Sequence, residues 1–235
     1  MKVHTLSRTE RPQQVTWLAM HQDYCETSVW HTDPPAEDLA GLACVKHLLK
    51  GGRGHYGPLE HPSITLAVGG FPHCVMQQAR THRVGLSFDV QSLRYTGKRI
   101  VSVAHGNLDL EEVIYLRPVA DYVDRQGKRY SYTAELRKQD LQECRRLAEG
   151  YAWKIAQGFS EEHSRSMLPF DFRQDFVVSF NLRSALHFMD LRSKADAQDE
   201  IRAMCDLLWR ELEWWAPEIC AWYGEARLGK AQLAP

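Results

Sequence analysis

The sequence lacks several features that would assign it to a common class of protein. Its six cysteines are scattered along 235 residues without a C-x-x-C pair, which argues against a disulfide scaffold and favours reduced thiols. No long hydrophobic run occurs, since the longest, near residues 64–71, is far too short to span a bilayer. Residues 1–10 contain no apolar segment of the kind that directs secretion. We therefore expect a cytoplasmic protein with no membrane partner.

An excess of charge of either sign is also missing. The 29 Lys and Arg residues are balanced by 30 Asp and Glu residues, which leaves a formal net charge of −1. Proteins that bind nucleic acids in general carry a basic surface, so we expect no nucleic-acid partner. Hydrophobic residues make up 44% of the chain, and no repeat, low-complexity tract or linker interrupts it. This composition predicts a single domain over residues 1–235.

Recognisable metal-binding and cysteine-protease-like motifs are absent as well. His55 and His61 flank Glu60, but their spacing matches no common zinc motif, so we expect no metal. No cysteine lies among basic residues that would lower the pKa of its thiol. Gly52–Gly57 matches G-x-G-x-x-G, yet a helix is expected before it and Pro58 follows. A glycine-rich connector is therefore the better interpretation.

Hydrophobic periodicity predicts a mixed α/β (α+β) fold, in which a small central sheet is flanked by long helices. We expect a strand and a helix within residues 1–31, further strands at 63–71, 111–118 and 176–180, and helices at 35–50, 72–79, 131–158 and 197–216. Residues 84–99 are expected to form a loop. Asn181 is expected to cap a helix that follows it, and Pro217 to kink or end the last helix.

Cationic side chains crowd residues 80–99, where Asp89 is the only carboxylate. The basic residues are Arg80, His82, Arg83, Arg94, Lys98 and Arg99. Unpaired charges at this density repel one another unless an anion is bound between them. Arginine binds phosphate through two hydrogen bonds at once, and Gln91, Ser92 and Thr96 are suited to orient a nucleotide. The stretch predicts a phosphorylated ligand.

A second cationic group lies in the C-terminal third of the chain. It comprises Arg165, Arg183 and Arg192, with Asp171, Asp175 and Asp190 nearby. Each of these arginines alone is typical of a surface residue in an ordinary ion pair. Two separate arginine-rich regions are, however, what a site needs if it holds both a nucleotide and a larger phosphorylated cofactor.

These motifs, in this order, resemble the signature of the flavin-dependent thymidylate synthases. Arg80-Thr-His82-Arg83, followed by Ser92-Leu-Arg94, is similar to the family pattern of Arg-His-Arg, seven residues and Ser. This chain has Thr81 inside the triplet and one more residue before Ser92. Residues 55–61 resemble the upstream family motif, with Gly57 in place of its Ser or Thr. Arg165 to Pro169, Asn181-Leu-Arg183 and Leu191-Arg192 resemble the C-terminal motifs. The resemblance covers about residues 55–200.

The resemblance implies the flavin-dependent thymidylate synthase fold, a homotetramer with sites at subunit interfaces, and reductive methylation of dUMP to dTMP. FAD is then the cofactor, and NADPH and methylenetetrahydrofolate are co-substrates. It implies FAD contacts from Arg80, His82, Arg83, Asn181, Arg183 and His187. It implies dUMP contacts from Gln78, with Gln77 as the alternative, and from Val90, Gln91, Ser92, Leu93, Arg94, Arg165 and Arg192.

Arg192 takes the catalytic role in this interpretation, at the uracil edge, where it stabilises negative charge as N3 ionises and so makes C5 more nucleophilic. A fixed guanidinium beside a developing anion needs no cysteine nucleophile. The alternative hypothesis is a non-catalytic nucleotide- or RNA-binding module that uses the same cationic stretch. The near-neutral net charge counts against it.

Overall fold

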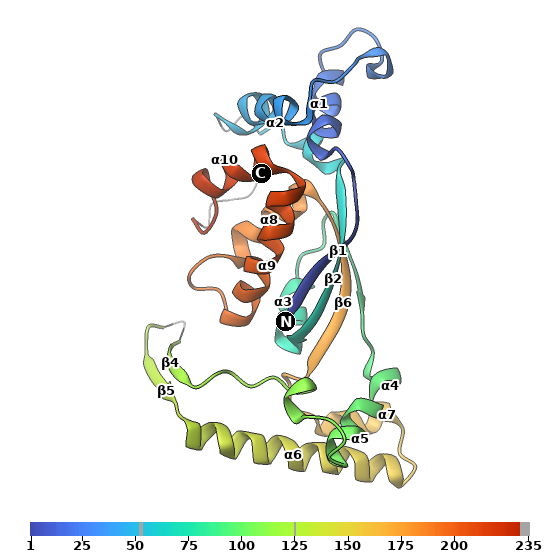
Figure 1. Ribbon diagram of the computed structural model, residues 1–235, viewed down its shortest axis with the longest axis vertical. Helices are drawn as coiled ribbons and strands as arrows, with labels where there is room; N and C mark the ends of the chain where they lie inside the picture. Colours follow the sequence, from blue (N-terminus) through green and yellow to red (C-terminus); the bar gives the residue numbers. More distant parts are fainter. Residues whose placement is uncertain (52–53, 125, 231–235) are drawn as a thin grey trace. The chain divides into compact units, whose positions relative to one another are not determined.

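A four-stranded sheet in the order β1-β2-β6-β3 organises the helices of the fold (Figure 1). Its strands are β1 (Lys2–Arg8), β2 (Ser63–Pro72), β6 (Arg173–Asn181) and β3 (Leu86–Val90). The computed structural model describes residues 1–51, 54–124 and 126–230. A small sheet accompanied by helices confirms the mixed α/β (α+β) class expected from the sequence.

The chain divides into two units, and β2, β3 and β6 each contribute residues to both. Unit 1 comprises Met1–Val68, Arg80–Asp89 and Val177–Pro235, and unit 2 comprises Gly69–Ala79 and Val90–Phe176. The single domain over residues 1–235 stays a prediction.

The helices of unit 1 come from the N-terminal and the C-terminal parts of the chain. They are α1 (Pro12–Gln22), η1 (Val29–His31), α2 (Glu37–Cys44), η2 (Val45–Leu49), η3 (Gly57–Glu60), α8 (Leu182–Arg192), α9 (Asp199–Trp215) and α10 (Pro217–Ala226). α2 continues directly into the π-helical turn η2, which confirms the helix expected at 35–50. Residues 52 and 53 of the expected glycine connector lie outside the described residues.

The core of unit 1 follows from the two periodicities in its sequence. In β2, alternate residues Ile64, Leu66 and Val68 are buried. In α9, which confirms the helix expected at 197–216, the apolar stripe from Ile201 to Trp215 is buried throughout. This helix lies beside β1, whereas α10 lies near α2 (Figure 1). The Trp215 indole donates a hydrogen bond of 2.9 Å to the carbonyl of Thr9, which attaches α9 to the end of β1.

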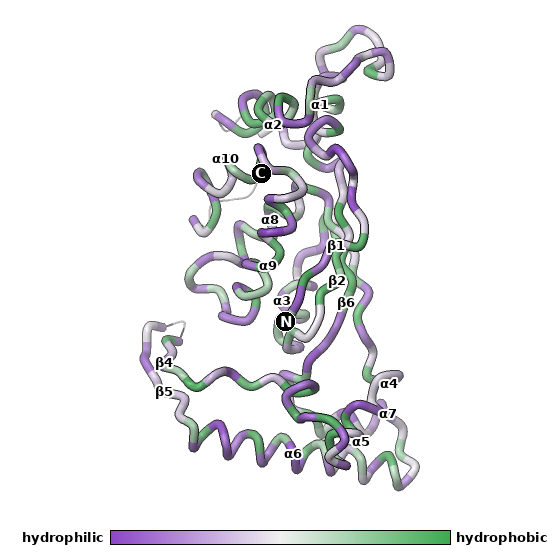
Figure 2. Tube along the Cα trace, viewed as in Figure 1, coloured by the Kyte–Doolittle hydropathy of each residue, from purple (hydrophilic) through white to green (hydrophobic). Residues whose placement is uncertain are grey.

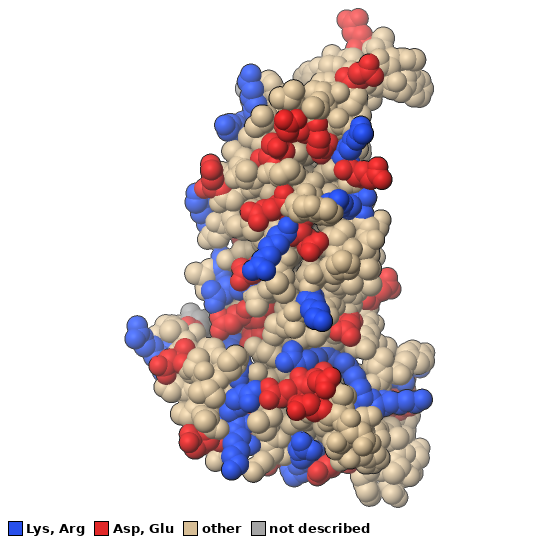
Figure 3. Space-filling model, viewed as in Figure 1, with Lys and Arg blue, Asp and Glu red and all other residues tan. Residues whose placement is uncertain are grey.

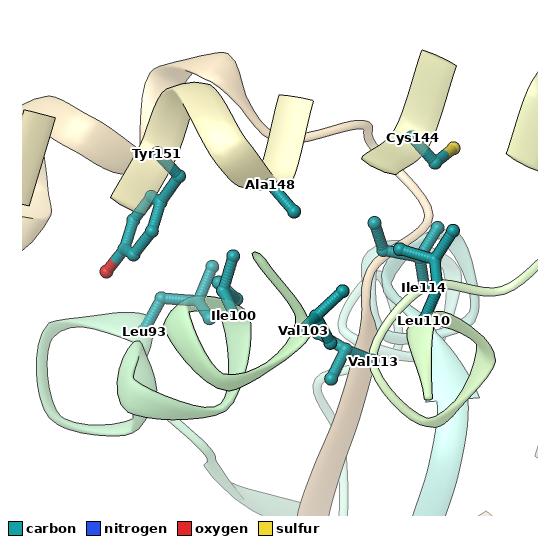
Figure 4. Packing of buried hydrophobic residues seen from close by; sticks show 9 residues of the cluster. All are labelled: Leu93, Ile100, Val103, Leu110, Val113, Ile114, Cys144, Ala148 and Tyr151. Atoms are coloured by element: carbon teal, nitrogen blue, oxygen red, sulfur yellow. The ribbon is translucent and has the colours of Figure 1, made fainter. Parts of the chain in front are cut away.

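Unit 2 is built around its long helix α6. Its elements are α3 (His73–Ala79), α4 (Leu93–Thr96), α5 (Lys98–Ala104), η4 (Leu110–Glu112), β4 (Ala120–Val123), β5 (Arg129–Tyr132), α6 (Ala134–Ala156), α7 (Glu161–Ser164) and η5 (Arg165–Met167). Hydrophobic and hydrophilic residues alternate along α6 in Figure 2. Its apolar side meets α4 and α5, where Leu93 and Ile100 point toward Tyr151 (Figure 4).

The loop expected at residues 84–99 is wrong. The structure places β3, α4 and α5 there, over Leu86–Val90, Leu93–Thr96 and Lys98–Ala104. The sequence analysis gave weight to the positive charge of this stretch and overlooked the alternation of its apolar residues. Leu86, Phe88 and Val90 alternate along β3, and all three are half-buried. Leu93 and Ile100 then supply buried side chains for unit 2, so burial rather than charge decides the local structure.

The strand expected at 111–118 is also wrong. The backbone N–H groups of Val113 and Ile114 donate to the carbonyl of Leu110 in a helical turn, and only an isolated bridge joins Ile114 to Phe172. The sequence analysis missed the antiparallel hairpin of β4 and β5, in which Ala120 faces Tyr132. Its side chains are mostly exposed, so the hydrophobic pattern carried little signal.

No described helix is both long enough and apolar enough to cross a membrane. Positive and negative side chains are interspersed over the face shown in Figure 3, in keeping with the net charge of −1.

The contact between Gly97 and Tyr151 gives a stability prediction for unit 2. A Cβ at Gly97 would lie 2.0 Å from the Tyr151 hydroxyl oxygen, and this ring is fully buried. Gly97→Ala should therefore lower the free energy of unfolding by about 1–3 kcal/mol in urea denaturation.

Tyr151→Phe should reduce the cost of Gly97→Ala, because it removes the clashing oxygen, which has no hydrogen-bond partner in the described part of the chain. Gly57→Ala is the matched control, since its Cβ meets nothing within 4 Å, and it should change the free energy of unfolding by less than about 0.5 kcal/mol. Equal effects of Gly97→Ala with and without Tyr151→Phe would contradict the packing argument.

Candidate functional site

The first candidate group lies in unit 1, where residues 80–85 form a turn beside α8. The turn is attached to the start of this helix, because the Ser184 hydroxyl donates to the carbonyl of Val84 at 2.7 Å and the backbone N–H of Asn181 donates to the carbonyl of Gly85. Gly85 has φ +68, and an added Cβ would lie 2.1 Å from Ser184 Oγ. Only glycine satisfies both this conformation and this close approach.

The N-terminus of α8 carries Arg183 one residue inside the helix. The Asn181 side chain accepts a hydrogen bond of 2.8 Å from the backbone N–H of Ser184, which confirms the expected cap. Arg183 Nη1 lies 2.5 Å from Glu60 Oε1, and both side chains are partly exposed. The guanidinium of Arg183 therefore lies near the positive N-terminal end of α8. Its ion pair with Glu60 is exposed to solvent and therefore weak.

Arg192, at the other end of α8, returns to the same turn. Its Nε donates to His82 Nε2 at 2.9 Å, and its Nη2 donates to Thr81 Oγ1 at 2.7 Å. The turn at 80–85 is therefore bonded to both ends of α8. These two contacts hold the guanidinium by two of its three nitrogens.

His82 is buried between the guanidinium and two rings of α8. Its ring lies 5.6 Å from His187 in an edge-to-face contact and 4.9 Å from Phe188, measured between ring centroids. Burial lowers the pKa of His82 to about 4, with further lowering from Arg192 and from His187. Burial also lowers the pKa of Arg192. The imidazole is therefore neutral at pH 7, and its Nε2 is free of a proton because it accepts from Arg192.

The remaining cations of this group face solvent. Arg80 and Arg83 flank His82 and are exposed, and neither forms an ion pair with any described residue. The structure thus brings together, in unit 1, all six residues implied for FAD and also Arg192.

The second candidate group lies in unit 2, on α4 and α7. The Ser92 hydroxyl accepts a hydrogen bond from the backbone N–H of Arg94 at the start of α4, and Arg94 Nε lies 2.6 Å from Glu162 Oε1 of α7. Arg165 follows three residues after Glu162 and is exposed. Arg94 is therefore bound to α7, and the exposed Arg165 directly follows the same helix.

The other residues implied for dUMP differ in what their side chains can do. Gln91 is joined to β6, because its N–H donates to the carbonyl of Asp175 and its carbonyl accepts from Gln174. Leu93 is buried in the hydrophobic cluster, which leaves only its backbone for a ligand. Val90 is half-buried at the end of β3, and Gln78 is half-buried in α3.

Part of the cationic stretch serves the fold instead. Arg99 is half-buried and its Nη2 donates to the carbonyl of Arg173, while burial lowers its pKa. Arg99, which was not among the residues implied for a ligand, is therefore bound to the backbone of β6.

Three partners of the candidate residues were missed from the sequence. Glu60 pairs with Arg183, Glu162 pairs with Arg94, and Thr81 accepts from Arg192. Glu60 could have been found, because it lies in the upstream motif of residues 55–61. Each of the other two pairs joins residues more than sixty positions apart, and a single sequence contains no pattern that predicts such a contact.

The surroundings of Glu60 contain a cavity of about 350 Å³, with Asp23 and His55 in its lining. His55 Nε2 lies 2.7 Å from Asp23 Oδ2. Gly57 lines the same cavity, and an added Cβ there would meet open space. Over residues 1–51, 54–124 and 126–230, no group of His, Cys, Asp or Glu is arranged to hold a metal ion.

All six cysteines are free thiols, and five of them are buried. Burial raises the pKa of Cys44 and of Cys205 to about 12, and it raises the pKa of Cys220 and Cys144 as well. These four thiols are protonated near pH 7, which makes them poor nucleophiles.

Arginine side chains in both groups, with the capped N-terminus of α8 in the first, are typical of the class of proteins that bind phosphorylated ligands. The chain matches the family described as thymidylate synthase complementing protein over residues 5–218. It is 32% identical to a flavin-dependent thymidylate synthase of Halobacterium salinarum and 30% identical to that of Haloarcula marismortui, with both chains covered completely in each case. The chain therefore belongs to the flavin-dependent thymidylate synthase family.

Solved structures confirm the fold. The flavin-dependent thymidylate synthase ThyX of Helicobacter pylori, complexed with FAD and dUMP, is similar with a TM-score of 0.68 at 17% identity, covering 89% of this chain and 93% of its own. The UMP/dUMP methylase PolB of Streptomyces cacaoi, bound with 5-Br dUMP, is similar with a TM-score of 0.72 at 19% identity, covering 100% and 97%.

The buried imidazole of His82 predicts a pH dependence of stability. Its pKa is about 4 in the folded protein against 6.5 for the free group, so the unfolded chain binds more protons between these values. Its contribution to stability is complete above pH 6.5 and is lost as the pH falls toward 4. Relative to His82→Gln, the wild-type protein should gain up to about 3 kcal/mol of unfolding free energy from pH 4 to 6.5.

Urea unfolding of both proteins at pH 4.5, 5.5 and 7 measures this gain. Other titrating groups act in both proteins and cancel in the difference. If the unfolding free energies of the wild-type protein and His82→Gln changed equally with pH, His82 would have the same pKa in the folded and the unfolded protein, which would contradict the prediction.

Proposed function

We propose that this chain is a thymidylate synthase that uses FAD to convert dUMP into dTMP, with the one-carbon unit from methylenetetrahydrofolate and the hydride from NADPH. The family supports the reaction, because the relatives of Halobacterium salinarum and Haloarcula marismortui are both named flavin-dependent thymidylate synthase and both align with this chain over their whole length. The observation that carries the proposal is the guanidinium of Arg192, held by Thr81 and His82 in the middle of the candidate cofactor residues.

The residues of unit 1 fit the diphosphate of FAD. Arg80 and Arg83 are exposed cations, and Arg183 stands at the capped N-terminus of α8 with an exposed ion pair that an anionic ligand can replace. Helix N-termini and arginine forks both favour phosphate groups. We assign FAD binding to Arg80, His82, Arg83, Asn181, Arg183 and His187, and bound FAD supplies hydride-transfer chemistry.

The residues of unit 2 fit the phosphate and base of dUMP. Ser92 caps α4, which carries Arg94, and Arg94 pairs with Glu162 of α7, the helix that Arg165 follows. Their charge suits a monophosphate, and the backbone of Val90 to Leu93 suits a pyrimidine edge. We assign dUMP binding to Gln78, Val90, Gln91, Ser92, Leu93, Arg94, Arg165 and Arg192. Gln77 is the weaker alternative to Gln78, since it is exposed and its amide lies 2.6 Å from His73 Nε2.

Arg192 is the proposed catalytic residue. A guanidinium fixed before the reaction stabilises negative charge on the uracil ring as N3 ionises, without reorganising at that moment. The ionised ring is electron-rich at C5, where the one-carbon unit is added. The buried thiols at Cys44 and Cys205, whose pKa is about 12, give no support to a cysteine nucleophile.

The proposal includes a homotetramer in the cytoplasm, with sites where subunits meet. Neighbouring subunits would then contribute residues to one site. The alternative, a non-catalytic nucleotide- or RNA-binding module, predicts salt-sensitive binding of oligonucleotides and no flavin.

The test of the proposed function begins with the purified protein. It should be yellow or take up FAD, its oxidation of NADPH should depend on dUMP, and it should form dTMP when methylenetetrahydrofolate is also present. Arg192→Ala should lower dTMP formation by at least about 100-fold, the scale for losing one preorganised charge, while FAD content stays unchanged. A protein that cannot be loaded with FAD, or an Arg192→Ala variant that loses FAD and keeps activity, would overturn the proposal.

Flavin retention tests the assignment of Arg83. Arg83→Ala should weaken FAD binding by about 10-fold or more, because a charge-assisted hydrogen bond contributes about 1.5–3 kcal/mol. Arg146→Ala is the matched control, since Arg146 is an exposed arginine of α6 that pairs with Glu143. Fluorescence titration with FAD measures both variants, and equal affinities would contradict the assignment.

A further inference from the structure

Two neighbouring residues of the turn at 80–85 hold the Arg192 side chain. Thr81 Oγ1 accepts from Nη2 at 2.7 Å, and His82 Nε2 accepts from Nε at 2.9 Å. Both distances are those of good hydrogen bonds to a charged donor. Thr81 is the residue that this chain carries inside the Arg-His-Arg pattern of the family, and the family resemblance gives it no role.

We propose that Thr81 and His82 form an acceptor pair that positions the Arg192 guanidinium for the pyrimidine substrate, and that His82 has this role in addition to its place among the FAD residues. The inference rests on the proposed function, because it takes Arg192 as the residue that faces uracil. Thr81 and His82 are positioning residues, since they act through Arg192.

The environment of His82 suits a hydrogen-bond acceptor for Arg192. Only 9% of the residue is exposed, and its contacts are with the guanidinium of Arg192 and the rings of His187 and Phe188. Since Nε2 accepts from Arg192, the proton of the neutral ring is on Nδ1. The accepting nitrogen is thus already used, whereas the exposed neighbours Arg80 and Arg83 remain directed to solvent.

Charge around the imidazole keeps it in the accepting form. The titratable groups that face it are Arg192 and His187 of α8, and both lower the pKa of His82 in addition to burial. Arg80 and Arg83 flank it in sequence. A protonated ring would lose its acceptor and would place a second positive charge against the guanidinium.

The acceptor pair matters because arginine is a flexible side chain. Fixing a long side chain costs up to about 2 kcal/mol of rotamer entropy. Because the two acceptors order the Arg192 side chain when the protein folds, this entropy is not lost again when the substrate binds. Thr81 contacts one end of the guanidinium and His82 its Nε, so the plane of the group is defined as well as its position.

The test uses variants that differ in one acceptor atom. Thr81→Val removes the hydroxyl and keeps the side-chain shape, whereas Thr81→Ser keeps the hydroxyl. His82→Gln places an amide oxygen near the position of Nε2, whereas His82→Asn is too short to do so. Thr81 is exposed, so its variants keep the test available even if the His82 variants fold poorly.

We expect Thr81→Val to lower kcat for dTMP formation by about 10-fold or more, with FAD content unchanged, whereas Thr81→Ser should keep most of the activity. Among variants loaded with FAD to the same extent, His82→Gln should be more active than His82→Asn. His105→Gln, at an exposed position, controls for replacing a histidine. Equal activity of Thr81→Val and Thr81→Ser, or of the two His82 variants at equal FAD content, would overturn the inference.

A double-mutant cycle on dUMP affinity shows whether the effect passes through Arg192. Calorimetric titration should find that Thr81→Val weakens dUMP binding several-fold in the wild-type background and by less than about 2-fold with Arg192→Ala. Equal effects in both backgrounds would overturn the inference.

The same measurements separate this inference from the proposed function. A wild-type protein without FAD or without dUMP-dependent NADPH oxidation would refute the proposed function itself. A fully active enzyme in which Thr81→Val behaves like Thr81→Ser would refute only the acceptor pair.

Discussion

The hydrogen bond from Arg192 to His82 is the constraint on which the candidate site depends. Together with the contact to Thr81, it ties the C-terminal end of α8 to the turn at 80–85, while Ser184 ties the start of the helix to Val84 of the same turn. An 11-residue helix spans about 16 Å, so the turn is held along the whole length of α8. The glycine at position 85 suits this arrangement, because a side chain there would collide with Ser184 at the start of α8.

Exposed ion pairs mark the cations that are available to a ligand. Arg183 pairs with Glu60 and Arg94 with Glu162, and all four side chains are at least 39% exposed. Such pairs contribute at most about 1 kcal/mol, whereas a phosphate offers an arginine two charge-assisted hydrogen bonds. The carboxylates therefore satisfy the arginines without competing strongly for them. This explains how a chain with a net charge of −1 presents sites for anions.

The packing of unit 2 gives its candidate residues a rigid base. Leu93 is buried against Ile100 and Tyr151 (Figure 4), so the residues on either side of it, Ser92 and Arg94, have a fixed backbone. Arg99 donates to the carbonyl of Arg173 beneath the same segment. A site that reads a base edge with backbone groups needs this rigidity, because small displacements of the donors weaken every hydrogen bond together.

The sequence by itself determined the elements whose signals are local. The buried stripe of α9, the cap at Asn181, strand β2 and the family motifs were all readable, because periodicity and capping depend on neighbours a few residues apart. Only the tertiary structure decided that residues 84–99 form β3, α4 and α5, since burial of Leu86 and Leu93 depends on distant partners. It also decided that Thr81 and His82 accept from Arg192, more than a hundred positions away. Hydrogen bonds of this kind leave no periodic trace in one chain, because each residue type is common and only the fold brings the atoms within 3 Å of each other.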